Sequence, residues 1–146
     1  MIFKEFYKKE GRKIAYNNLI KNNIDGLIIL GGDGSLTGAS VFTNEYNFPV
    51  IGIPCTIDND IYGSDYSIGF ATARETIVSA IDKIRDTAFS HDRIFIIEVM
   101  GRNSGWLTGF TAKMYYDSLD EKKLYLHDTF DKRRYDIHGI YVPERE

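Results

Sequence analysis

The sequence has little cysteine, no excess of basic charge and no long apolar run, and each lack excludes a class of protein. The one cysteine, Cys55, excludes an internal disulfide framework and suits a reducing compartment. A net charge of −3 gives no basic field for binding nucleic acid. No apolar run approaches the roughly 20 residues of a membrane span, and the charged start lacks the apolar segment of a signal peptide. We therefore expect a cytoplasmic protein that binds neither nucleic acid nor membrane.

What is present resembles an ordinary globular domain, with 43% hydrophobic and 27% charged residues. Short apolar runs bounded by glycine or proline alternate with segments of helical periodicity. This alternation predicts an α/β fold with a doubly wound, mostly parallel sheet flanked by helices. The predicted strands are 26–30, 50–53, 93–99 and 137–142, the predicted helices are 11–23, 36–45, 68–88 and 106–116, and 119–135 is predicted to be a charged surface segment.

In such sheets, ligands bind outside the carboxyl ends of the strands. Three of the predicted strands run directly into loops that are rich in glycine or aspartate. We therefore expect the chemistry of this protein to lie in those loops.

The first loop is Gly31-Gly32-Asp33-Gly34-Ser35. Glycines let backbone N–H groups approach a phosphate, and the following helix directs its positive end at the same anion. Asp33 offers a carboxylate of the kind that Mg²⁺ prefers. The alternative interpretation is a tight β–α turn in which aspartate caps the helix.

The second loop is Pro54-Cys55-Thr56-Ile57-Asp58-Asn59-Asp60. Two carboxylates that follow a buried strand can have different chemical roles. One can accept a proton from a hydroxyl group, and the other can order a metal ion and its water. Thr56 adds a hydroxyl group for a phosphoryl group in transfer. The alternative is a loop whose Asx side chains only cap their own backbone.

The third loop is Met100-Gly101-Arg102. An arginine just beyond a strand can bind a phosphoryl group through two hydrogen bonds and stabilise its charge during transfer. The alternative is an arginine that is merely solvated. Arg93 lies at the opposite end of the same predicted strand, so it is either solvated or faces a neighbouring subunit.

These three loops, in this order, resemble the phosphofructokinase family, and the Thr-Ile-Asp-Asn-Asp stretch is the most specific part. The resemblance is clear over residues 3–111. It implies that 112–136 are a divergent insertion and that 137–146 form a final strand. The whole chain, 1–146, would then be one partial domain. Chains of that family are much longer and begin with another glycine-rich loop. We therefore expect an internal fragment or a truncated gene product. The matching stretches are 31–39, 54–61 with Gly63, Asp65 and 68–69, and 81–105.

The resemblance implies a nucleotide site at Gly32, Asp33, Gly34 and Ser35, with Asp33 on Mg²⁺. Chains that use ATP carry glycine at the position of Gly34, whereas pyrophosphate users tend to carry aspartate, which would fill the space of the α-phosphate. Gly34 therefore favours ATP, while the cysteine at position 55 matches neither branch and residues 103–108 look more like the pyrophosphate branch.

The resemblance also implies the acceptor and the chemistry. Asp58 would remove the proton from the 1-hydroxyl of fructose 6-phosphate, and Asp60 would organise metal-bound water. Thr56 and Arg102 would stabilise the moving phosphoryl group. The residues implied to line the sugar site are Thr56, Ile57, Asp58, Met100, Gly101 and Arg102.

Two further arginines receive roles from the resemblance alone. Arg93 would reach the 6-phosphate of the sugar across a subunit interface, which implies a homo-oligomer, a tetramer in this family. Arg85 would contact a diphosphate effector, as in an allosteric enzyme.

The sequence therefore predicts phosphoryl transfer from ATP to fructose 6-phosphate in glycolysis, by a chain with little activity on its own. One alternative is the same chemistry with pyrophosphate. Another is a Gly-Gly-Asp-Gly kinase for NAD or a lipid, against which the loops of Asp58 and Arg102 argue. A third is a domain that binds nucleotide without catalysis.

Overall fold

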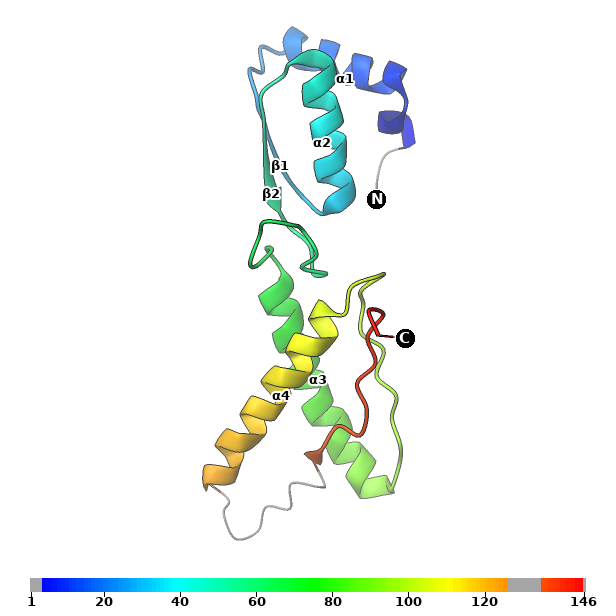
Figure 1. Ribbon diagram of the computed structural model, residues 1–146, viewed down its shortest axis with the longest axis vertical. Coiled ribbons are helices and arrows are strands. Elements are labelled where there is room, and N and C mark those ends of the chain that lie inside the picture. The colour runs from blue at the N-terminus through cyan, green and yellow to red at the C-terminus, as the bar shows by residue number, and fades with distance from the viewer. Residues whose placement is uncertain (1–3, 126–134, 146) are drawn as a thin grey trace. The chain divides into compact units, whose positions relative to one another are not determined.

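The computed structural model describes residues 4–125 and 135–145, which belong to two compact units (Figure 1). The first unit comprises Met1–Thr56 and Ile61–Ile68, and the second comprises Ile57–Asp60 and Gly69–Glu146. The short segment 57–60 thus belongs to a different unit from the residues on either side of it.

The first unit contains a parallel sheet of two strands, and a helix connects one strand to the other, as the sequence predicts. Strands β1 (Leu27–Gly31) and β2 (Val50–Pro54) pair from Leu27 opposite Val50 to Gly31 opposite Pro54. Helix α2 (Asp33–Tyr46) connects them and packs against both, as Figure 1 shows. The short 3₁₀ helix η1 (Lys4–Tyr7) and helix α1 (Lys9–Lys21) precede the sheet.

The core of the first unit is aromatic. Phe42 of α2 is 1% exposed and lies 5.7 Å from the ring of Phe6 and 5.8 Å from that of Phe48, centroid to centroid. Tyr16 of α1 stacks on Tyr46 at 4.6 Å. Such offset and edge contacts bury much apolar area, so this cluster holds η1 and α1 against α2.

One face of the small sheet is not covered by the described residues. Ile28, Leu30 and Ile51 are 65%, 58% and 64% exposed. The sequence predicts buried strands, and for this face of the sheet that prediction is wrong. The strands form because their backbones pair, but burial of both faces requires a second layer of structure.

The second unit is built on two long helices, α3 (Phe70–His91) and α4 (Trp106–Tyr125). Val78 of α3 packs with Tyr115 and Leu119 of α4, and both α4 residues are 1% exposed. Helix α4 continues well beyond the predicted end at residue 116, so residues 119–125 of the predicted charged surface segment are helical, and Leu119 is buried. Burial of Leu119 against α3 explains the extension, and 126–134 lie outside the described residues.

The predicted strands 93–99 and 137–142 are also wrong, because neither segment is a strand in the described chain. The apolar run is present, but Ile94 and Ile96 are each 97% exposed. A strand requires hydrogen bonds to a neighbouring strand, and among the described residues only β1 and β2 form such a ladder. Over the described residues 137–145 the chain is therefore not a strand.

The predicted fold class is confirmed, since the structure has a parallel sheet flanked by helices. None of the helices in the described part of the chain combines the length and the apolarity needed to span a membrane.

Candidate active site

The glycine-rich loop forms the N-terminus of α2. Strand β1 ends at Gly31, Gly32 caps the helix, and Asp33 is its first residue. The amide of Ser35 donates to the carbonyl oxygen of Gly32 at 3.0 Å, and Gly31 approaches Ser35 so closely that an added Cβ would lie 2.5 Å from the serine Cβ. The first N–H groups of a helix lack partners within the helix. This loop therefore has the form of a phosphate site, with the exposed carboxylate of Asp33 at its edge.

The end of β2 brings Thr56 to this loop. Because Pro54 is paired with Gly31, the amide of Cys55 donates to the carbonyl oxygen of Gly31 at 2.9 Å. A Cβ on Gly32 would lie 3.4 Å from the Cβ of Thr56. The parallel pairing therefore places the Thr56 side chain beside the glycine-rich loop, as expected for neighbouring strand ends.

The second unit brings Asp58 to the loop that carries Arg102. The hydroxyl group of Ser104 donates to the carbonyl oxygen of Asp58 at 2.9 Å. Asp58 is partly buried, whereas Arg102 is exposed and available to an anion. Asn59 has φ of 52°, a left-handed conformation that asparagine tolerates.

Residues 101–105 form a tight turn before α4. Gly101 has φ of +146°, and a Cβ there would meet the carbonyl oxygen of Ser104 at 2.4 Å. The amide of Gly105 donates to Oε1 of Glu144 at 2.7 Å. The bond to Glu144 thus holds the end of the turn next to α4, and Met100, 73% exposed, and Arg102 lie at its other end.

The other two predicted arginines differ in their surroundings. Arg93 is exposed, directly after the end of α3. Arg85 donates to Asp82 at 3.0 Å and to Asp86 at 2.9 Å, and its guanidinium lies 4.5 Å from the ring centroid of Tyr135. Arg85 is therefore engaged within its own unit.

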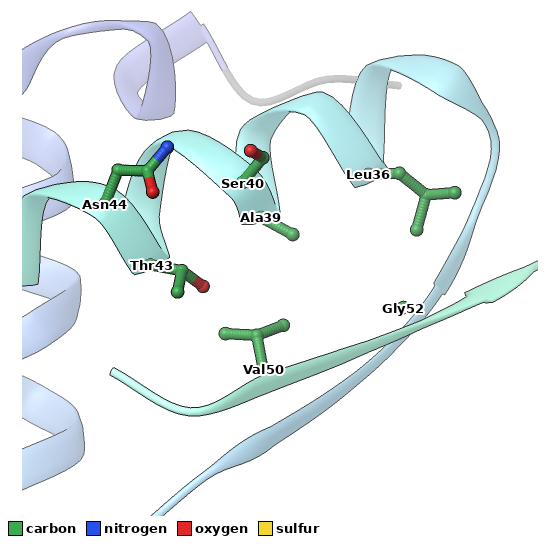
Figure 2. Close-up of a pocket in the computed structure, with 7 residues that line it drawn as sticks. All are labelled: Leu36, Ala39, Ser40, Thr43, Asn44, Val50 and Gly52. Carbon is green, nitrogen blue, oxygen red and sulfur yellow. The ribbon is translucent and has the colours of Figure 1, made fainter. Parts of the chain in front are cut away.

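An open hollow of about 320 Å³ lies between α2 and β2 (Figure 2). Figure 2 shows side chains of the helix facing the strand across it. A Cβ on Gly52 would lie 2.7 Å from Cδ2 of Leu36, so glycine lets the helix and strand approach here. None of the predicted site residues lines this hollow, whose lining is Leu36, Ala39, Ser40, Thr43, Asn44, Val50 and Gly52.

A complete protein cage for a metal ion is absent from residues 4–120 and 135–145, where no three His, Cys, Asp or Glu side chains gather. Mg²⁺ does not require one, because it commonly binds one or two carboxylates, water and substrate phosphate. Asp33, exposed at a helix end suited to phosphate, fits that requirement.

Sequence reasoning did not single out Ser104 and Glu144. The bond of Ser104 to Asp58 joins residues 46 positions apart, and that of Glu144 to Gly105 spans 39. No local pattern encodes such contacts. The only sequence signal was that Ser104 lies two residues after Arg102.

The first unit has a helix N-terminus suited to phosphate, and the second unit has the carboxylate and arginine loops. A family model described as Phosphofructokinase matches residues 2–115, which is most of the chain, and the chain belongs to this family.

Known relatives agree with this assignment. The chain is 59% identical over 104 residues to ATP-dependent 6-phosphofructokinase 2 of Bacteroides thetaiotaomicron, covering 71% of this chain and 32% of the relative. It is 60% identical over 102 residues to ATP-dependent 6-phosphofructokinase of Aquifex aeolicus, covering 69% and 32%. The structure of phosphofructokinase from Saccharomyces cerevisiae matches with a TM-score of 0.72 and 39% identity, over 76% of this chain and 18% of that one. The chain spans about a third of the length of these curated relatives.

Proposed function

We propose that this chain supplies the phosphate-donor loop and the catalytic base of an ATP-dependent 6-phosphofructokinase. The reaction transfers a phosphoryl group from ATP to the 1-hydroxyl of fructose 6-phosphate and gives fructose 1,6-bisphosphate, a step of glycolysis. The observation that carries the proposal is the pairing of Gly31 with Pro54, which sets Thr56 beside the N-terminus of α2. Membership of the phosphofructokinase family supports the same reaction.

On the donor side, Gly32, Gly34 and Ser35 line the phosphates, which accept hydrogen bonds from the N–H groups of Gly32 and Gly34 and lie at the positive end of α2. Asp33 would hold Mg²⁺, which would neutralise charge on the donor phosphates. The relatives carry the words ATP-dependent in their names, and Gly34 leaves space for a nucleotide. Both favour ATP over pyrophosphate.

On the acceptor side, the Asp58 carboxylate accepts the proton of the 1-hydroxyl as its oxygen attacks phosphorus. Arg102 and the Thr56 hydroxyl stabilise the charge of the phosphoryl group in transfer. Asp60, an exposed carboxylate, would orient water near the metal site. Ile57, Met100 and Gly101 line the sugar.

The proposal extends to the assembly. The exposed Arg93 binds the sugar 6-phosphate of a neighbouring subunit in a homotetramer. Arg85 belongs to a diphosphate effector site, where a ligand has to compete with Asp82 and Asp86 for the guanidinium. A cytoplasmic location suits the free Cys55.

A chimera tests this function. Residues 2–115 replace the corresponding part of the Bacteroides thetaiotaomicron relative, and turnover with ATP and with pyrophosphate is measured separately. We expect transfer with ATP, and a fall in kcat of about 10²- to 10⁴-fold in Asp58→Asn, because the general base is lost.

The control is Asp25→Asn, an exposed aspartate before β1, which we expect to leave kcat unchanged. Near-normal turnover of Asp58→Asn would exclude Asp58 as the base. Transfer from pyrophosphate alone would exclude ATP as the donor.

A further inference from the structure

A buried serine connects two loops of the second unit. Ser104 is 7% exposed, and its hydroxyl group donates to the carbonyl oxygen of Asp58 at 2.9 Å. This distance is within the range of a good O–H···O hydrogen bond. The two loops joined in this way carry Asp58 on one side and Arg102 on the other.

The surroundings of Ser104 leave it little freedom. Its carbonyl oxygen would lie 2.4 Å from a Cβ on Gly101, so the turn closes only with glycine at that position. The next amide, that of Gly105, is bound by Glu144 at 2.7 Å. A Cβ on Gly105 would meet Oε2 of Glu144 at 2.5 Å and Cβ of Val142 at 2.6 Å. The backbone of Ser104 is therefore closely packed on the Gly101 side and held by a hydrogen bond on the Gly105 side.

We propose that Ser104 is a positioning residue, whose hydroxyl group holds the backbone of Asp58 at a set place relative to the Arg102 turn. This inference rests on the proposed function, in which Asp58 is the base and Arg102 stabilises the phosphoryl group. Ser104 acts through the Asp58 backbone and does not itself touch the reacting atoms. A displacement of about 1 Å at a reacting group can lower a rate about 100-fold, so such a bond matters for catalysis.

The serine hydroxyl is the chemical feature that the role requires. Alanine at 104 removes the donor and leaves the Asp58 carbonyl without that partner, whereas threonine keeps a hydroxyl on the same Cβ. Ser118 offers a matched control, because its hydroxyl donates to the carbonyl oxygen of Tyr115 at 2.7 Å, away from both loops.

The first measurement is amide hydrogen exchange by NMR on the full chain without ligand. In Ser104→Ala we expect exchange in residues 57–60 to rise about five- to tenfold, the effect of losing one buried hydrogen bond. Ser104→Thr should restore slow exchange, and Ser118→Ala should leave 57–60 as in the wild type. Unchanged exchange in Ser104→Ala would overturn the proposal.

The second measurement follows ligand binding through the fluorescence of Trp106, the single tryptophan, which is 52% exposed and directly follows Gly105. We expect Ser104→Ala to weaken binding of fructose 6-phosphate about five- to tenfold, with threonine restoring it. Binding of ATP, measured by calorimetry, should stay the same, because the donor loop belongs to the other unit.

Equal losses for both ligands would indicate general destabilisation and would overturn the positioning role. A wild-type chain that binds ATP but no fructose 6-phosphate would instead count against the acceptor side of the proposed function. The exchange rates of 57–60 would then decide the role of Ser104 by themselves.

Discussion

Two glycines of the second unit occupy contrasting surroundings. Gly101 has φ of +146°, and a Cβ there would lie 2.4 Å from a backbone oxygen. Gly109 is in helix α4, and a Cβ there would meet nothing within 4 Å. The same residue type is therefore required at one position and dispensable at the other.

We expect Gly101→Ala to lower the free energy of unfolding by roughly 1–3 kcal/mol, because the side chain adds strain and a clash. Gly109→Ala should raise it by roughly 0.5–1 kcal/mol, because alanine favours the helix. Urea unfolding followed by circular dichroism measures both. A stable Gly101→Ala variant would mean that the 101–105 turn can relax.

Several site residues could be predicted from the sequence because they follow strands that formed. The glycine-rich loop and Thr56 come directly after β1 and β2, and the parallel pairing brings them together. The roles of all the predicted site residues, those of the glycine-rich loop and Thr56 included, stay predictions. Ser104 and Glu144 were not predicted, because their contacts depend on chain segments that are distant in sequence.

At the scale of elements, one ion pair ties the N-terminal segment to α2. Arg12 donates to both carboxylate oxygens of Glu45 at 2.7 Å and to the carbonyl oxygens of Phe6 and Tyr7 at 2.8 Å. The hydrogen bonds from Arg12 lower the pKa of Glu45 below its usual 4.5. A group with a depressed pKa stabilises the fold when it is ionised.

This stabilisation should be complete above the usual pKa of 4.5 and should be lost as the pH falls through the lower folded pKa. We expect Glu45→Gln to show a smaller fall in the urea midpoint between about pH 6 and pH 3 than the wild type. The exposed Glu75→Gln serves as control and should follow the wild type. An unchanged acid profile in Glu45→Gln would contradict the assignment.

Tyr115 joins helix α4 to the segment that begins at Tyr135. Its hydroxyl donates to the carbonyl oxygen of Tyr135 at 2.8 Å, and burial raises its pKa above the usual 10.0. The neutral phenol is therefore favoured in the folded state, so stability is complete below about pH 10 and falls as the pH rises through the folded pKa.

We expect Tyr115→Phe to lower the free energy of unfolding by roughly 1 kcal/mol at neutral pH. It should also weaken the loss of stability above about pH 10. Thermal melts across alkaline pH measure this, with the 91% exposed Tyr141→Phe as control. A Tyr115→Phe variant that loses stability at high pH as steeply as the wild type would show that another group titrates.

At the scale of the whole molecule, the chain forms two units and covers 32% of its curated relatives. Phosphoryl transfer depends almost entirely on positioning and electrostatic stabilisation. The proposed function assigns to this chain the donor loop, the base and the arginine loop, which are some of the groups that such a transfer uses.

We therefore expect the isolated chain to turn over well below the roughly 1–100 s⁻¹ of ordinary kinases. An assay coupled to the consumption of fructose 1,6-bisphosphate measures this, with the chimera as the active control. Ordinary turnover by the chain alone would overturn the expectation.

The sequence by itself determined the α/β class, the β1–α2–β2 order and the glycine-rich loop, because periodicity and glycine spacing act within a few residues. It did not determine whether 93–99 and 137–142 become strands, since a strand exists only when another strand pairs with it. It also did not determine how far α4 extends, which depends on Leu119 packing against Val78. Only the tertiary structure decided the link from Asp58 to Ser104, because that hydrogen bond joins segments that no local rule brings together.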